Sequence, residues 1–392
     1  MKQQTKQLPT GWKEVELSKV IKLRGGYAFK SEKFVEQGIP IIRISNFDNN
    51  NVNLSGVVYY SKEDSRTYNE FLLKENDILI AMSGATTGKI GVIIKENEPC
   101  LLNQRVGKFE IIDKNIFFKY LLMFVKSSEF QKKVFNIASG CAQPNISGKQ
   151  IESIKIPLPP LPIQKQIVSI LEKAEALKQR REKADKLTKE YLKSVFAEMF
   201  LKKGFEEKEL EKVADIIMGQ SPPGNSYNEK GEGTPFFQGK AEFTEKYPLI
   251  KKWTTKPSKL AEPNSILISV RAPVGDVNLC NVKCCIGRGL ASIKPIKKLA
   301  NLYYIYFLLQ SIKDKIEYLG SGSTFKAINS RQLRNLKIPL PPLPLQQKFA
   351  NIVEKVEKLK EKQKQSKEEI NIMFDALMQK AFKGELVKDG KK

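Results

Sequence analysis

The chain has 392 residues, 41% of them hydrophobic, which suffices for two or three domains with separate cores and excludes an unfolded chain. Lys and Arg total 67 against 43 Asp and Glu, and this net charge of +24 favours a polyanionic partner, nucleic acid first, although a lysine-rich proteome gives the same excess. The sequence has no long apolar run and a polar N-terminus, so we expect no membrane span and no signal peptide, and its five cysteines favour a reducing cytoplasm.

The residue content also limits the chemistry. Histidine is absent from the sequence, which removes the usual general base and the Ser-His and Cys-His nucleophile pairs. Cys280, Cys284 and Cys285 cluster without a second ligand pair at zinc-site spacing, and Cys100 and Cys141 stand alone. We therefore predict ordinary buried thiols and no metal site.

In the first half of the chain, short apolar runs between Gly, Pro, Asn and Ser residues predict strands at 39–44, 77–82 and 89–94. A helical pattern follows at 117–137. The phrase Ile-Pro-Leu-Pro-Pro-Leu-Pro at 156–162 then acts as a stop and start signal, because proline cannot continue a strand but tolerates the first turn of a helix. A long helical pattern runs from Ile163 to Phe200.

The second half repeats this order. Its apolar runs predict strands at 235–237, 265–270 and 290–293. A helical pattern at 299–319 and a second proline phrase at 338–344 follow, and a long helical pattern runs from Leu345 to Phe382. We predict an α+β domain used twice, with globular domains at 1–153 and 205–335 and with phrases and helices at 154–204 and 336–392.

The two halves align well beyond the proline phrase. The offset drifts from 193–195 early to 182 late, which places loop-length differences inside the repeats. The matched positions pair Gly26 with Gly219, Gly38 with Gly233, Arg43 with Gln238, Arg105 with Arg288, and Ile146 with Ile328. This duplication indicates two copies of one structural unit, and a two-part protein suggests a two-part target.

The two long helical patterns each carry one apolar seam at a spacing of three and four residues. Neither helix can bury that seam alone. We therefore predict an antiparallel coiled coil with pseudo-twofold symmetry that holds the two globular domains apart. Two alternatives stay open, in which each helix folds back onto its own domain or pairs with another protein.

Two motifs that resemble catalytic signatures lack residues that those signatures require. Residues 83–90, Ser-Gly-Ala-Thr-Thr-Gly-Lys-Ile, have one residue too few between the glycines for a phosphate loop and lack the Ser or Thr after the lysine. We interpret them as a strand-to-strand turn that exposes a basic residue. The Pro-Pro pairs lack the flanking residues of amino-methyltransferases, and no acidic cluster has nuclease spacing.

Polar and basic residues in matching loops of both halves are the candidates for DNA contact. Arg can pair with guanine and Gln or Asn with adenine, while Lys and Ser suit phosphates. The candidates are Tyr27, Lys30, Arg43, Asn46, Ser83, Lys89, Gln104, Arg105, Gln143, Asn145, Gln220, Ser221, Gln238, Lys240, Arg271, Arg288, Thr324 and Lys326. The alternative is that most of these are solvated loop residues, and for any single one of them that alternative outweighs base contact.

The chain resembles the specificity subunit of a type I restriction–modification system over essentially its whole length. The resemblance is carried by the duplicated phrases, by the Gln-Lys-Gln and Gln-Gln-Lys that follow them, and by the runs Gly-Ile-Pro-Ile-Ile-Arg at 38–43 and Ile-Gly-Arg-Gly-Leu at 286–290. The resemblance implies two target-recognition domains on coiled-coil spacers, reading a bipartite DNA sequence. It also implies that the helices from Ile163 to Phe200 and from Leu345 to Phe382 meet partner subunits.

The same resemblance implies that this chain is non-catalytic and holds no cofactor. Two modification subunits would bind S-adenosylmethionine and methylate adenine, and restriction subunits would hydrolyse ATP with magnesium. Three rival interpretations remain: a stand-alone DNA-binding phage-defence protein, a coiled-coil adaptor whose ends bind RNA or proteins, and a nuclease with unrecognised acidic residues.

Overall fold

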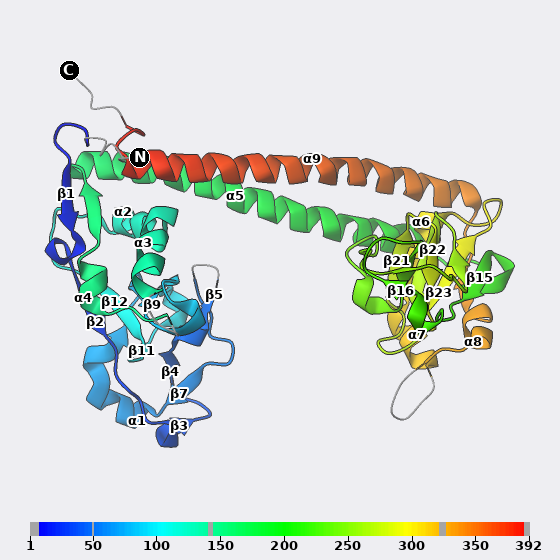
Figure 1. The fold of residues 1–392 in the computed structure, drawn as a ribbon, viewed down its shortest axis with the longest axis horizontal. Coiled ribbons are helices and arrows are strands. Elements are labelled where there is room, and N and C mark those ends of the chain that lie inside the picture. The colour runs from blue at the N-terminus through cyan, green and yellow to red at the C-terminus, as the bar shows by residue number, and fades with distance from the viewer. Residues whose placement is uncertain (1–7, 49–50, 140–143, 321–326, 388–392) are drawn as a thin grey trace. The chain divides into compact units, whose positions relative to one another are not determined.

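The computed structural model describes residues 8–48, 51–139, 144–320 and 327–387. The chain forms two compact units, residues 1–180 with 366–392 and residues 181–365, and each unit contains one half of each long helix (Figure 1). These units divide the chain differently from the predicted boundaries, because contacts join each globular part to segments of both long helices. The predicted boundaries follow the sequence repeat, and as repeat boundaries they stay a prediction.

The first unit contains two main sheets, of order β10-β9-β12-β2 and β3-β7-β4-β11-β8, and the small pairs β1-β13 and β5-β6. Its strands are β1 (Lys13–Glu16), β2 (Ile21–Gly25), β3 (Phe34–Val35), β4 (Ile39–Ile42), β5 (Phe47–Asp48), β6 (Asn51–Val52), β7 (Val58–Tyr60), β8 (Leu72–Leu73), β9 (Ile78–Ala81), β10 (Ile90–Val92), β11 (Cys100–Leu102), β12 (Val106–Ile111) and β13 (Lys155–Leu158). Its short helices are α1 (Lys62–Ser65), α2 (Phe118–Lys126), α3 (Ser128–Ala138) and α4 (Gly148–Glu152).

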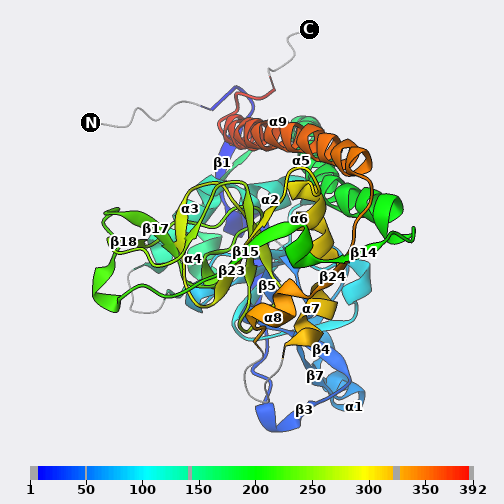
Figure 2. The same cartoon turned by 90° about the vertical axis from the view of Figure 1, so that its right-hand side faces the viewer.

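The second unit repeats this plan with sheets of order β15-β23-β20-β21 and β16-β18-β17-β22-β19 and the pair β14-β24 (Figure 2). Its strands are β14 (Glu207–Glu209), β15 (Ala214–Met218), β16 (Tyr227–Asn228), β17 (Thr234–Phe237), β18 (Trp253–Thr254), β19 (Leu260–Ala261), β20 (Ser265–Ser269), β21 (Val277–Cys280), β22 (Cys284–Ile286), β23 (Leu290–Pro295) and β24 (Lys337–Pro339). Its short helices are α6 (Leu302–Ser311), α7 (Lys313–Leu319) and α8 (Ser330–Arg334).

The four-stranded sheet is the middle layer of each globular part, between helices and the second sheet. Successive residues of a strand point to opposite faces. Accordingly Ile80 of β9 joins the core under the helices, while Leu79 joins the core between the sheets. Ile268 and Leu267 of β20 divide in the same way. Burial on both faces explains why these strands read as continuous apolar runs, and the duplicated α+β domain is confirmed.

The helical patterns predicted at 117–137 and 299–319 each break into two helices, α2 with α3 and α6 with α7. Ser127 has an extended backbone (ψ 147°) and its side chain accepts a hydrogen bond from the Phe130 N–H, so it caps the second helix. Ile312 interrupts the other pattern with ψ 19°. The apolar spacing continues through both breaks, and spacing alone could not reveal them.

The proline phrase is partly a strand, which its interpretation as a stop and start signal missed. Pro157 lies in β13 opposite Glu14 of β1, in a two-stranded ladder where a residue without an N–H is tolerated. The long helix α5 (Leu161–Phe196) begins with Pro162 in its first turn, as predicted. A π-helical turn (Ala197–Leu201) extends it, and the second phrase leads into α9 (Leu343–Phe382) in the same way.

A buried glutamine ties each phrase to its domain. The Gln164 side-chain amide donates to Asn115 O and Pro159 O, both at 2.8 Å, and its oxygen accepts from Phe117 N at 2.7 Å. Gln346 repeats this pattern, because its side-chain amide donates to Pro341 O and its oxygen accepts from Asn301 N at the start of α6. Both side chains are fully buried, so this glutamine satisfies polar groups of the backbone and not a ligand.

Segments of the two long helices pack antiparallel within each unit. In the first unit, the start of α5 and the end of α9 share one core, and the Lys178 ammonium lies 4.7 Å from the centre of the Phe374 ring. In the second unit, the end of α5 meets the start of α9, with the Phe196 and Phe349 rings 5.2 Å apart. The predicted antiparallel pair is therefore found, although its seam is open in places, since Leu359 is 47% exposed.

Candidate nucleic-acid interface

The first rim is the group of loops that follow β2, β4 and β9 and connect β11 to β12. We define it as residues 26–27, 43, 82–84, 103–105 and 145. Tyr27 N donates to Leu102 O and Gln104 N donates to Tyr27 O, both at 2.9 Å. Met82 N donates to Arg105 O at 2.9 Å. The rim backbone is thus part of the sheet framework, which places its side chains at fixed points.

Four predicted contact residues of the first half line one hollow of about 300 Å³ in this rim: Ser83, Gln104, Arg105 and Asn145. Ser83 and Asn145 form an isolated bridge, and Gln104 and Arg105 lie in the loop between β11 and β12. The Ser83 hydroxyl and the Arg43 Nε are buried, and neither has a hydrogen-bond partner among the described residues. Two buried polar groups of the first rim thus have no hydrogen-bond partner within the described fold.

The second rim has the same construction in residues 219–221, 238, 270–271, 287–289 and 327. Gln220 N donates to Ile286 O at 2.9 Å, and Val270 N donates to Gly289 O at 2.9 Å. Arg288 N lies 3.4 Å from the Ser221 hydroxyl that accepts its hydrogen bond. The side chains of Gln220, Gln238 and Arg271 are exposed.

The hydrogen-bond register matches the two rims residue by residue and corrects one predicted pair. Leu102 and Ile286 accept the equivalent bonds, from Tyr27 and Gln220. Gly26 and Gly219 donate equivalent bonds to Val106 and Leu290. Three residues separate the two acceptors in each rim. Gln104 is therefore the counterpart of Arg288, and Arg105 is the counterpart of Gly289, so the predicted Arg105–Arg288 pairing was displaced by one residue.

The predicted pairing of Arg43 with Gln238 is confirmed. Ile42 pairs with Leu102 in the β4–β11 ladder, and Phe237 pairs with Ile286 in the β17–β22 ladder, so the residue after each is equivalent. Glycine makes this approach possible. A Cβ on Gly26 would lie 2.3 Å from Asn103 O, and one on Gly219 would lie 2.2 Å from Gly287 O. Only glycine fits where one rim loop crosses the other.

The turn after β9, which resembled a phosphate loop, is a strand-to-strand turn, as predicted. Ala81 N donates to Lys89 O, and Ser269 N donates to Asp276 O, so Lys89 and Asp276 are counterparts. Lys89 is exposed. Asp276 instead pairs with Lys240 (2.6 Å) and Lys313 (2.8 Å). Burial acts to raise the pKa of Asp276, but the hydrogen bonds from the two lysines outweigh it and lower the pKa below its usual value.

The comparisons with known proteins agree with this duplicated frame. The family profile described as "Type I restriction modification DNA specificity domain" matches residues 9–188 and 202–371. A Methanocaldococcus jannaschii protein assigned as the MjaX type I restriction enzyme specificity subunit is 35% identical, over 97% of this chain and 95% of its own.

The chain belongs to the type I specificity-subunit family and has two target-recognition domains. The fold agrees with solved structures. A chain from a study of complex assembly and conformational transition of the type I R-M system matches with a TM-score of 0.69 and 27% identity, over 97% of this chain and all of that one. The HsdS subunit from Thermoanaerobacter tengcongensis matches with a TM-score of 0.52 and 26% identity, over 98% of this chain and all of that one.

Tyr27 of the first rim and the remaining predicted contact residues of this specificity subunit have different surroundings. Tyr27 is half-buried among aromatic rings, with the Tyr68 ring centre 4.5 Å away, and a hydrogen bond with Tyr68 raises the pKa of Tyr27. Lys30 is exposed beyond the first rim. Asn46 is buried, and its amide bonds the backbone of Arg43 and Asn53. Gln143, Thr324 and Lys326 lie outside the described residues.

The sequence reasoning missed the two short helices that bring residues 144–146 and 327–328 to the rims. Ser147 caps α4 and Asn329 caps α8, each in a capping box with a glutamine three residues later. Ile146 N then donates to Met82 O, and the second rim repeats this bond. The pattern Ser or Asn, two residues, then Gln was visible in the sequence and could have located both helices.

The cysteines behave as predicted where they are described. Cys100, Cys280, Cys284 and Cys285 are buried and free, and Cys141 lies outside the described residues. Burial raises the pKa of the Cys100 thiol to about 12. In the part of the chain that the structure describes, no group of three or more Cys, Asp or Glu residues is placed to hold a metal. None of the described helices is long and apolar enough to cross a bilayer.

Proposed function

We propose that this specificity subunit reads a bipartite double-stranded DNA target, with one half-site for each rim. The observation that carries the proposal is the match between the rims. Their backbones share one hydrogen-bond pattern, while Gln104 corresponds to Arg288, and Arg43 corresponds to Gln238, at equivalent points. A common frame with different side chains is what two readers of different base sequences require.

The side chains at these points suggest their bases. The side chain of Arg288 is exposed, so its guanidinium donors can reach the O6 and N7 atoms of guanine. The amide of Gln104 can pair with the N6 and N7 atoms of adenine. We propose that these two residues read one base each, at corresponding positions of the two half-sites.

The charge of the chain supplies the part of the affinity that does not depend on sequence. A net charge of +24 favours binding to the phosphate backbone with release of counterions. This contribution weakens as salt rises, with a slope that counts the phosphates contacted. Base contacts then discriminate among sites that all gain the same electrostatic attraction.

We further propose that the long helices bind the modification and restriction subunits of a cytoplasmic assembly. The helices carry exposed apolar residues at Leu187, Tyr191 and Ile372, at 54%, 52% and 70% exposure. Apolar groups of this kind favour burial against a partner. In this proposal two methyltransferase subunits bring S-adenosylmethionine, restriction subunits bring ATP and magnesium, and this chain performs no catalysis.

Methylome sequencing of the host, with and without this chain, tests the proposal. We expect one bipartite methyl-adenine motif to disappear when the chain is removed and to return when it is supplied again. An unchanged set of motifs would contradict the proposal. Magnesium-dependent cutting of DNA by the purified chain would contradict its non-catalytic role.

A further inference from the structure

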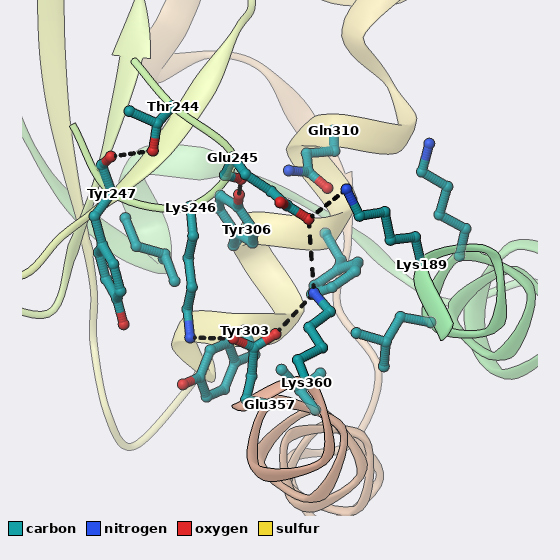
Figure 3. Close-up of a pocket in the computed structure, with 15 residues that line it drawn as sticks. Lys189, Thr244, Glu245, Lys246, Tyr247, Tyr303, Tyr306, Gln310, Glu357 and Lys360 are labelled. Carbon is teal, nitrogen blue, oxygen red and sulfur yellow. Dashed lines mark hydrogen bonds and ion pairs between the residues drawn. The ribbon is translucent and has the colours of Figure 1, made fainter. Parts of the chain in front are cut away.

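One loop of the second unit, residues 244–247, reaches from the sheet to both long helices (Figure 3). Its backbone is fixed on β21: Leu279 N donates to Lys246 O at 2.8 Å, and the Asn278 side chain exchanges hydrogen bonds with the backbone of Thr244. Movement of this loop is therefore movement of the sheet that carries the second rim.

Five charged side chains join this loop to the helices, and we call them the clasp: Lys189, Glu245, Lys246, Glu357 and Lys360. The Lys246 ammonium lies 2.7 Å from one Glu357 oxygen, and the Lys360 ammonium lies 3.1 Å from the other. Lys360 also lies 4.0 Å from Glu245, which pairs with Lys189 of α5 at 3.2 Å. The charges alternate along the whole clasp, so each group has a partner of opposite sign.

The inner pair of the clasp is the part shielded from solvent. The side chains of Lys246 and Glu357 are 25% and 24% exposed, against 58% and 63% for Lys189 and Glu245. Lys246 also lies over the rings of Tyr247 and Tyr303, 5.0 and 5.9 Å from their centres. Half-buried, ring-supported pairs hold a geometry better than exposed ones, which contribute little.

A hollow of about 560 Å³ opens beside the clasp, next to the apolar core in which Leu192 and Val353 of the long helices pack against the domain. Its walls include Tyr303 and Tyr306 of α6 as well as the clasp residues (Figure 3). The clasp therefore adds directional polar contacts at the edge of this core, where the loop meets the helices. In the first unit, Lys119 of α2 pairs with Glu172 of α5 at positions 50% and 43% exposed.

We propose that the Lys246–Glu357 pair is a positioning device that sets the angle of the second target-recognition domain on the long helices, and with it the spacer length that the bipartite target must have. This inference rests on the proposed function. Neighbouring base pairs are about 3.4 Å apart along DNA, so a small tilt of the domain moves its rim by one step. The pair touches no base and acts only through the orientation of the rim.

Charge reversal tests the proposal in the full-length chain assembled with its modification subunits. The duplexes carry the two native half-sites with the native spacer or with one base pair more or less. We expect Lys246→Glu and Glu357→Lys each to lower the preference for the native spacer about tenfold, the factor that 1.4 kcal/mol gives. The double variant, which restores the pair in reverse, should regain most of that preference, and the half-site bases should not change in any variant.

Lys119→Glu is the matched control, because it makes the same charge change as Lys246→Glu in an exposed pair. It should weaken binding to all three duplexes by the same factor. Wild-type spacer preference in both single variants would overturn the proposal, as would equal weakening on every spacer together with a lowered Tm. A wild-type assembly without any two-part target would instead refute the proposed function, before the variants are compared.

Discussion

The two target-recognition domains differ in their side chains where they agree in their backbones. In the first rim, the Tyr27–Leu102 bond places Gln104, and in the second the Gln220–Ile286 bond places Arg288. The side chains of Gln104 and Arg288 can vary at little cost to the fold, because the backbone and the glycines hold these loops. The backbone and the glycines that hold the rims are therefore separable from the side chains that we propose read the bases, and substitutions can test each.

The largest effect is expected at the framework glycines. Gly26→Ala should destabilise the first domain by about 3 kcal/mol, because its Cβ would lie 2.3 Å from two backbone oxygens that cannot move independently. The neighbouring Gly25 provides the control, because no atom lies within 4 Å of the place that its Cβ would take. Urea unfolding of Gly25→Ala and Gly26→Ala measures the difference, and equal stability of the two would break the framework argument.

The two buried glutamines should behave alike, because they make equivalent hydrogen bonds to the backbone in the two domains. Gln164→Leu and Gln346→Leu should each cost about 2 kcal/mol, because carbonyls and an N–H at the helix starts lose their partners. Chemical denaturation gives both values. A large difference between the two variants would show that the two domains do not share this device.

The rim side chains should behave differently in the two domains. Arg288→Gln should change base preference at one position of one half-site, with a loss of about 1–3 kcal/mol for the original base, and should leave the other half-site unchanged. Competition binding with single-base variants of the target measures this. Lys294→Gln, at the far end of β23, removes the same charge and should weaken binding to all sequences equally.

The smallest effect on stability is expected from substitution of Asp276 and of its counterpart Lys89. The pKa of Asp276 is lowered in the folded state, so its contribution to stability is present above the pKa of the unfolded chain and is lost as the pH falls through the folded value. Asp276→Asn should therefore cost about 1 kcal/mol at pH 7 and nothing in acid. Thermal melts across pH measure this, and Lys89→Gln, which is exposed, should change stability by less than about 0.5 kcal/mol.

The sequence was enough to predict the duplication, the α+β class, the long helices and most buried strands, because proline phrases and apolar runs repeat in it. It could not predict the break at Ser127, where a cap interrupts an unbroken apolar pattern. The predicted pairing of Arg105 with Arg288 was off by one residue, because a register difference of one residue appears only in the hydrogen bonds. The clasp at Lys246 joins residues over a hundred positions apart, and no local pattern marks it.

The most direct test of the central claim, that each rim reads one half-site, is the methylome of a host whose specificity subunit carries the first domain twice. In this chimera a second copy of residues 12–154 replaces residues 205–336, and a thermal melt confirms that the chimera folds. The account predicts a two-part methyl-adenine motif with the same bases in both halves. A motif that keeps the original second half-site would contradict it.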